Sequence, residues 1–123
     1  MHINFDPHSP AQDLISFEDF LKVDIRIGEV VEVEDFPEAR NPSFKLRIDF
    51  GEGVGIKKTS AQLKGHYCEN SLQGKRVAAV VNFPPRQIGK FMSEVLVLGF
   101  SDENEDVVLF DPDHSLPKGS RLH

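Results

Sequence analysis

The sequence has few of the features on which disulfide-linked and membrane-spanning proteins depend. Its one cysteine, Cys68, leaves no partner for an internal disulfide, and a lone thiol fits a reducing compartment. No apolar run approaches the ~20 residues that a membrane-spanning helix needs, and residues 1–15 have neither a basic start nor an apolar centre. We therefore expect a cytoplasmic protein without membrane insertion.

Patterns typical of catalysis and of metal binding are also missing. The five histidines include no pair at ligand spacing, whereas structural zinc takes about four Cys or His ligands. There is no phosphate-binding Gly-Lys-Ser/Thr loop, no dinucleotide glycine triplet and no nucleophile elbow. Ser93 lies beside Glu94, but no histidine near it in sequence could act as a base. We predict a non-enzymatic protein with no cofactor and no metal site.

Charge is unevenly distributed along the 123 residues. Residues 37–90 hold ten Lys or Arg and four acidic residues, a net charge of +6, while the whole chain carries −6 and the flanks therefore −12. A basic middle between acidic ends is typical of a local anion-binding surface on an acidic body, and equally of a solvated face without a ligand. Charge alone leaves both interpretations open.

Alternation of apolar and polar residues predicts the first strand. Apolar residues recur at every second position over most of residues 23–33, which places Val31 on the inner face, and Gly28 is a natural bend point. We therefore predict one long strand with a bend at Gly28.

The next two strands are predicted to share a basic outer face. Apolar residues of the stretch 44–50 alternate cleanly with Lys45 and Arg47, which must therefore face away from the core. A third strand returns with Lys57 and Lys58, of which one will point outward because the side-chain period of a strand is two.

Three short helices are predicted. Residues 10–15 follow a capping serine and begin with proline, and residues 17–21 follow Ser16 with apolar residues at helical spacing, which suggests a turn of helix plugging one end of the fold. Residues 60–65 begin with a cap and end at a glycine. We expect the leader, residues 1–16, either to be disordered or to clasp a partner subunit.

Residues 75–100 predict two core strands joined by a polar loop. Pro84 and Pro85 cannot donate to a ladder, so the first of these strands must stop at about Phe83. A polar connection on a rigid base suits a binding site, although a plain hairpin loop would look the same. A last strand is predicted over residues 107–110, after an acidic turn.

The order of these elements is that of an OB-fold. A bent strand, a hairpin, a helix between strands three and four, and two more strands make a five-stranded Greek-key barrel. We therefore predict an all-β fold with short helices, in which a leader (1–16) precedes an OB-fold domain (17–123), with N- and C-terminal extensions around the barrel. Such barrels present strands two and three and nearby loops to oligonucleotides.

Eleven residues on this face and in these loops are candidate ligand-binding residues. They are Asn82, Arg86, Lys90, Ser93, Glu94, Arg40, Lys45, Arg47, Lys57, Lys58 and Gln62. The cations could contact phosphates, and Asn82 and Ser93 could bond base edges or sugars. Asn82 could equally cap the strand end and hold the Pro84-Pro85 loop. Phe83, Phe91 and Tyr67 could stack on bases, or the two phenylalanines could pack in the core.

Six stretches, in order along the chain, carry a specific resemblance. They are FLKVDIRIG at 20–28, FPEAR at 36–40, KLRIDFG at 45–51, GIKKTSAQ at 55–62, VVNFPPR at 80–86 and SEVLVLG at 93–99. These stretches resemble the CsaA family, small export-related chaperones built on the tRNA-binding domain that is also appended to methionyl-tRNA synthetases. The resemblance covers residues 17–122.

The resemblance implies an OB-fold homodimer in the cytoplasm, without a cofactor, that binds either unfolded export precursors and the secretion motor or tRNA. The wider tRNA-binding domain usually has a Gly-Met pair shortly after the serine that corresponds to Ser93. Val95-Leu96 occupies that place here, as in the chaperone branch. The resemblance therefore favours a non-catalytic export chaperone for unfolded precursor polypeptides, with a protein that binds tRNA or structured RNA as the alternative.

Overall fold

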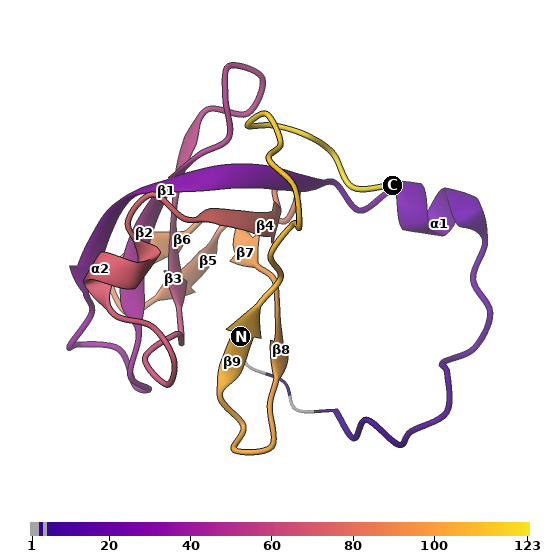
Figure 1. The fold of residues 1–123 in the computed structure, drawn as a ribbon, viewed down its shortest axis with the longest axis horizontal. Helices are drawn as coiled ribbons and strands as arrows, with labels where there is room; N and C mark the ends of the chain where they lie inside the picture. The colour runs from indigo at the N-terminus through magenta and orange to yellow at the C-terminus, as the bar shows by residue number, and fades with distance from the viewer. Residues whose placement is uncertain (1–2, 4) are drawn as a thin grey trace.

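A computed structural model of the chain describes residues 3 and 5–123. Five antiparallel strands form one sheet in the order β3-β2-β1-β4-β7, which curls into a nearly closed barrel (Figure 1). These strands are β1 (Ile25–Asp35), β2 (Phe44–Asp49), β3 (Ile56–Ala61), β4 (Arg76–Val80) and β7 (Leu96–Val97). Outside the sheet lie α1 (Phe17–Leu21), α2 (Glu69–Leu72), β5 (Arg86–Ile88), β6 (Phe91–Ser93), β8 (Gly99–Ser101) and β9 (Val107–Leu109). The predicted all-β OB-fold with short helices is confirmed.

β1 is long because it pairs with two neighbours. Its first residues, 25–29, pair with β4, and its later residues pair with β2. The register against β2 shifts between Val30 and Glu32, so Val31 is the extra residue of a β-bulge. The bulge leaves Val30 fully buried and Val31 38% exposed. The prediction that Val31 lies on the inner face is wrong for this reason.

Gly28 serves packing rather than the bulge. A Cβ at this position would lie 2.5 Å from Ile48 Cγ2 and 2.7 Å from Phe50 Cδ1. Only a residue without a side chain lets β1 approach the core this closely. The alternation predicted for residues 44–50 is confirmed, since its four apolar side chains are buried and Arg47 is exposed.

The predicted helix over residues 10–15 is wrong. These residues form neither helix nor strand, and the Leu14 side chain is completely exposed. A helix of this length needs a surface to pack on, and none is supplied. The predicted turn of helix after Ser16 forms as α1, with Ser16 and Asp19 in a capping box, but α1 has no buried residue and does not plug the barrel.

The helix predicted between the third and fourth strands forms, but at a later position in the chain than predicted. Residues 60–65 do not form it, because Ser60 and Ala61 continue β3 and pair with β2. The helix is α2, which places the fully buried Leu72 in the core cluster of the barrel. Gly74, with φ of +80°, ends the turn after α2 and is the sequence signal for its position.

The stretch 75–100 contains more turns than predicted. β4 ends at Val80 rather than near Phe83, the intervening loop folds into the β5–β6 hairpin, and the second apolar run is divided between β7 and β8. β8 pairs with β9, which ends at Leu109. This hairpin projects from the barrel (Figure 1).

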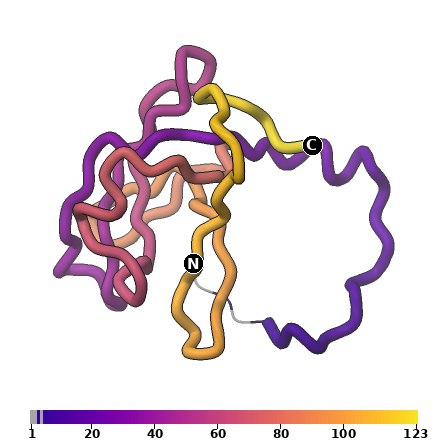
Figure 2. The backbone as a smooth tube through the Cα atoms, in the orientation of Figure 1, coloured from indigo at the N-terminus to yellow at the C-terminus, as the bar shows by residue number. Residues whose placement is uncertain are grey.

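The end of the leader, at α1, and the end of the tail lie side by side (Figure 1). From residue 5 to α1 the leader forms an open arc that starts near the β8–β9 hairpin and swings away from the barrel (Figure 2). The tail instead follows β1, with Gly119 N–H donating to the Ile27 carbonyl (2.8 Å) and Leu122 N–H to the Ile25 carbonyl (2.9 Å). Among the described residues, no helix is long and apolar enough to cross a membrane.

Candidate ligand-binding groove

Side chains, rather than a continuous backbone ladder, close the barrel between β3 and residues 93–95. Ser60 N–H donates to Ser93 Oγ (3.3 Å), and Lys58 N–H donates to Glu94 Oε1 (2.9 Å). In return, Glu94 N–H donates to the Lys58 carbonyl (2.8 Å). We call residues 58–60 together with 93–95 the seam.

A buried pair of hydroxyls lies at the centre of the seam. Thr59 is completely buried and Ser93 is 8% exposed, with 2.8 Å between their side-chain oxygens. The Thr59 hydroxyl donates to the Val95 carbonyl (2.7 Å), so Ser93 can donate to Thr59 while it accepts from the Ser60 N–H. Ser93 therefore supports the barrel, and its predicted contact with a ligand stays a prediction.

β3 and β7 separate beyond the seam and border a groove of about 700 Å³. Most of the barrel residues that line it are apolar, among them Leu63, Ile88, Leu96, Val97, Leu98 and Phe100. Three of the predicted ligand-binding residues, Arg40, Gln62 and Arg86, also line it. The apolar lining could not be predicted from the sequence, because each of these residues has the character of an ordinary strand or loop residue.

One strand edge turns its peptide groups toward the groove. Leu98 N–H donates to the Ala78 carbonyl (2.9 Å), which makes Ala79 and Val97 the non-hydrogen-bonded pair between β4 and β7. The peptide groups of Val97 therefore point away from β4. They point to the side of β3, with which β7 is not paired. Free strand edges of this kind accept an extended chain as an additional strand.

The start of the leader reaches the same groove. Ile3, Phe5, Asp6 and Pro7 contribute to its lining. Ile3 is 53% exposed and Phe5 77% exposed, so both side chains cover the groove only partly. We call these four residues the leader tip.

The outer face of β2 and β3 is of mixed charge rather than basic. Lys45, Arg47 and Lys58 share this face, as predicted, whereas Lys57 lies opposite the buried Ile48 on the other face. Carboxylates lie between the cations: Arg47 Nε is 3.3 Å from a Glu32 oxygen, and Lys45 Nζ is 3.9 Å from a Glu38 oxygen. The expected basic strip is therefore interrupted.

Half of the ten cations in residues 37–90 have a carboxylate partner. The pairs are Lys45–Glu38, Arg47–Glu32, Lys64–Asp35, Lys75–Asp111 and Arg76–Glu29. No carboxylate of the described residues lies within 4.0 Å of the other five cations, which are Arg40, Lys57, Lys58, Arg86 and Lys90. Four of the five acidic partners come from the flanks, so folding cancels part of the asymmetry seen along the chain.

The Asn82 side chain binds the backbone of the segment that precedes β1. Its Oδ1 accepts from Asp24 N–H (2.9 Å), and its Nδ2 donates to the Lys22 carbonyl (2.7 Å). The amide therefore binds backbone, as one of the two interpretations held, but that of the segment before β1 rather than that of the proline loop. Of the other predicted residues, Lys90 is exposed at the turn of the β5–β6 hairpin.

The aromatic candidates divide between packing and exposure. The ring of Phe91 packs on that of Phe36 with centroids 5.4 Å apart, while Phe83 is 50% exposed. The Tyr67 hydroxyl accepts from Leu109 N–H (3.0 Å), which ties β9 to the barrel. Phe83 is thus the candidate that is most available for stacking.

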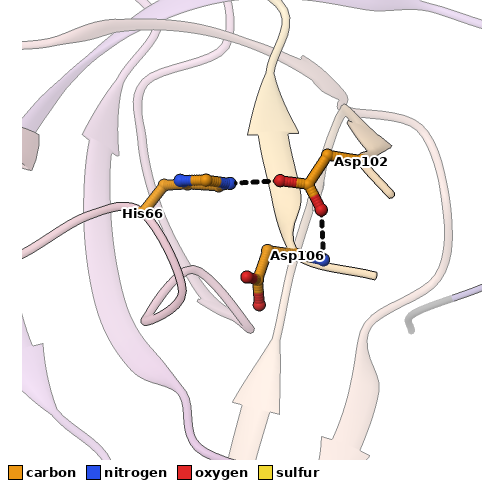
Figure 3. A group of neighbouring side chains, drawn as sticks. All are labelled: His66, Asp102 and Asp106. Carbon is orange, nitrogen blue, oxygen red and sulfur yellow. Dashed lines mark hydrogen bonds and ion pairs between the residues drawn. The ribbon is translucent and has the colours of Figure 1, made fainter. Parts of the chain in front are cut away.

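A cluster of His66, Asp102 and Asp106 fastens the β8–β9 hairpin (Figure 3). His66 Nε2 lies 2.5 Å from Asp102 Oδ2, while Asp102 Oδ1 accepts from the N–H groups of Asn104 and Asp106. The hydrogen bond from His66 holds the pKa of Asp102 below its usual range. Three ligands are one fewer than the roughly four of a structural zinc site, and the expected absence of a metal stays a prediction.

Comparisons with known proteins identify the family and the fold of the chain. A family profile described as "Putative tRNA binding domain" matches residues 25–121. The fold is similar to the chaperone CsaA of Bacillus anthracis (48% identity, TM-score 0.84, 90% of this chain and 100% of that one) and to CsaA of Picrophilus torridus (46%, TM-score 0.83, 89% and 100%).

The chain is also 34% identical over 114 residues to a methionine–tRNA ligase of Porphyromonas gingivalis. The match covers 93% of this chain but 16% of that ligase, so the chain spans about a sixth of the length of such relatives. The chain therefore belongs to the tRNA-binding domain family, and it is built on the same barrel as the CsaA chaperones.

Proposed function

We propose that this protein is a non-catalytic chaperone of the CsaA type that holds unfolded polypeptide in the groove between β3 and β7. The observation that carries this proposal is an apolar groove of about 700 Å³ beside the free edge of β7. Apolar side chains of a ligand would contact the lining, and its backbone would pair with the peptide groups of Val97. Neither contact depends on the sequence of the ligand, which suits a chaperone that holds unfolded polypeptide.

The charges at the groove suit the same ligand. Arg40 and Arg86 line it and have no carboxylate partner among the described residues, so they can pair with acidic side chains of a bound chain. The similarity to CsaA chaperones extends the proposal to the cell, where the ligands would be unfolded export precursors, delivered to the secretion motor from the cytoplasm.

A homodimer is part of this proposal. Several apolar side chains have no cover in the single chain: Leu14 is fully exposed, Ile15 is 71% exposed and Phe17 66% exposed. A second copy would cover such surface. Two grooves on one body would also raise the avidity for a long unfolded chain. Light scattering coupled to size exclusion should give twice the mass of 13.8 kDa.

Suppression of aggregation tests the chaperone function. A denatured test enzyme is diluted with an equimolar amount of the dimer, and turbidity is followed. We expect Phe100→Asp to weaken suppression because Phe100 lines the groove and is 63% exposed. Phe83→Asp is the matched control, since Phe83 is 50% exposed and lies outside the groove. If the unaltered protein suppresses no aggregation, the proposed function is wrong.

The second candidate function is binding of tRNA or structured RNA. The observations that favour it are the family profile and the five cations without a carboxylate partner. Each phosphate contact should contribute roughly 0.7 to 0.9 to the slope of log K against log salt. Under this function, Arg40→Gln with Arg86→Gln should lower that slope by roughly 1.5. A slope unchanged by both substitutions would exclude RNA from the groove.

A further inference from the structure

We propose that the leader tip is a tethered competitor for the groove, so that the N-terminus of the chain lowers the affinity of the groove for unfolded polypeptide. This inference rests on the proposed function of the groove. The inference adds a regulation of ligand binding to the proposed function. This regulation depends on four residues that precede the barrel: Ile3, Phe5, Asp6 and Pro7.

The contact is already present in the folded chain. The leader tip shares the lining of the groove with Val97, Leu98 and Phe100. About half of the Ile3 surface and a quarter of the Phe5 surface are covered, since the two residues are 53% and 77% exposed. A contact this shallow occupies the groove without closing it permanently, and a ligand that buries more apolar surface can displace it.

The chemistry of the leader tip is that of the proposed ligand. It presents two large apolar side chains, and Asp6 lies in a groove that is also lined by two arginines. Pro7 has no N–H to donate, so strand pairing along the tip must stop there. The leader tip is therefore too short to make more than a weak, local contact with the groove.

The segment that follows acts as the tether. It is not packed on the barrel, as the 100% exposure of Leu14 and the 71% exposure of Ile15 show. Its far end is anchored, because Arg121 donates to the Leu21 carbonyl (2.7 Å) and Asn82 to the Lys22 carbonyl (2.7 Å). The tip is thus held near the groove at all times.

The tether sets the size of the effect. A short flexible linker gives an effective concentration on the order of 1 mM. If the tip alone binds with a dissociation constant of about 1 mM, it occupies the groove about half of the time and weakens a competing ligand about twofold; with about 0.1 mM, the effect is about tenfold. A two- to tenfold change is measurable.

The test uses the full chain and a permanently unfolded probe, fluorescein-labelled lactalbumin that has been reduced and carboxymethylated. Its affinity is measured by fluorescence anisotropy. The double variant Ile3→Ser with Phe5→Ser should bind the probe two to ten times more tightly than the unaltered chain. The matched control, Ile56→Ser with Phe83→Ser, removes two exposed apolar side chains that lie outside the groove and should leave the affinity unchanged.

A synthetic peptide of residues 1–9 provides the complementary measurement. Added to the Ile3→Ser, Phe5→Ser variant at millimolar concentration, it should weaken probe binding again. Equal affinity of that variant and the unaltered chain would overturn the inference while leaving the proposed function intact. So would a gain that appears only at protein concentrations at which the chain self-associates, because the tip would then act between copies.

Failure of the proposed function has a different result: no variant binds the probe. The leader contact is then read by hydrogen exchange of the Val97 backbone amide, which points away from β4 and which the tip shields when it occupies the groove. Faster exchange in the Ile3→Ser, Phe5→Ser variant supports the occupancy of the groove by the tip. Unchanged exchange overturns it.

Discussion

Replacement of Ser93 by alanine tests the side-chain closure of the barrel. The substitution leaves the Ser60 N–H without its acceptor and removes the partner 2.8 Å from the Thr59 hydroxyl. A hydrogen bond contributes about 0.5 to 1.5 kcal/mol net, and a buried donor left unpaired costs about 1 to 3 kcal/mol. We expect the free energy of unfolding to fall by about 2 kcal/mol, a large part of the roughly 5 to 15 kcal/mol of a typical domain.

Urea unfolding followed by circular dichroism measures this loss. Ser60→Ala is the matched control. It also removes a serine hydroxyl, next to Thr59 in the chain, but the Ser60 hydroxyl has no hydrogen bond to any described residue. It should lie within about 0.5 kcal/mol of the unaltered protein. A double-mutant cycle of Ser93→Ala with Thr59→Val should give a coupling energy of about 1 kcal/mol.

Two results would refute the structural role of Ser93. One is a free energy of unfolding for Ser93→Ala within about 0.5 kcal/mol of the unaltered protein. The other is a tenfold loss of ligand affinity without a loss of stability, which would make Ser93 a direct ligand contact. We expect the affinity to stay within about threefold, since the hydroxyl is buried behind the groove.

Three further predictions concern packing, pH and thiol chemistry. Gly28→Ala should destabilise the protein by about 1 to 3 kcal/mol through overpacking, whereas Gly53→Ala, with no atom within 4 Å of the new Cβ, should be nearly neutral in urea unfolding. Lys118 and Asp49 form an ion pair of 2.9 Å; backbone N–H donation and then Lys118 lower the pKa of Asp49, and Asp49 raises that of Lys118. The pair should therefore stabilise the fold at pH values above the unfolded carboxyl pKa of 3.8 and below the unfolded amine pKa of 10.5. Lys118→Gln should lower the unfolding midpoint at pH 7 but not at pH 2. An equal decrease of the midpoint at both pH values would contradict the pairing. Exposed Cys68, whose pKa is lowered by a backbone N–H donor, should react with a disulfide reagent at pH 7 faster in the native protein than in the urea-unfolded protein, and slower reaction in the native protein would show that this donor is ineffective.

The strands could be predicted from sequence because their periodicity records which face is buried. Residues 44–50 alternate without interruption, and the structure buries the expected side chains. The same reasoning failed at Val31, since a bulge inserts one residue and inverts the alternation without leaving a compositional mark.

The short helices were harder because local signals compete with pairing. Ser60 and Ala61 have the composition of a helix start, but pairing with β2 and the acceptor at Ser93 favour strand. α2 has four residues, too few for a periodic pattern, and Leu72 is its one clear link to the core.

The candidate site could be predicted only in part. Arg40, Gln62 and Arg86 came from the polar loops and the resemblance, and the structure brings all three to one groove. The pairing of Arg47 with Glu32 was hidden from the sequence, because it depends on cross-strand register. The free edge of β7 was hidden as well, because every residue in it reads as core.

The seam, where the barrel is closed largely by side chains, can open locally at a low cost in free energy. Opening the seam requires rotation of the side chains of Thr59, Ser93 and Glu94 and loss of one backbone hydrogen bond, from Glu94 N–H to the Lys58 carbonyl, whereas opening any other pair of strands in the sheet requires a backbone ladder to separate. The groove adjoins the seam. The width of the groove can therefore fluctuate on the timescale of local opening while the rest of the sheet stays intact. Ligands of different thickness could then be admitted by one site without unfolding the domain.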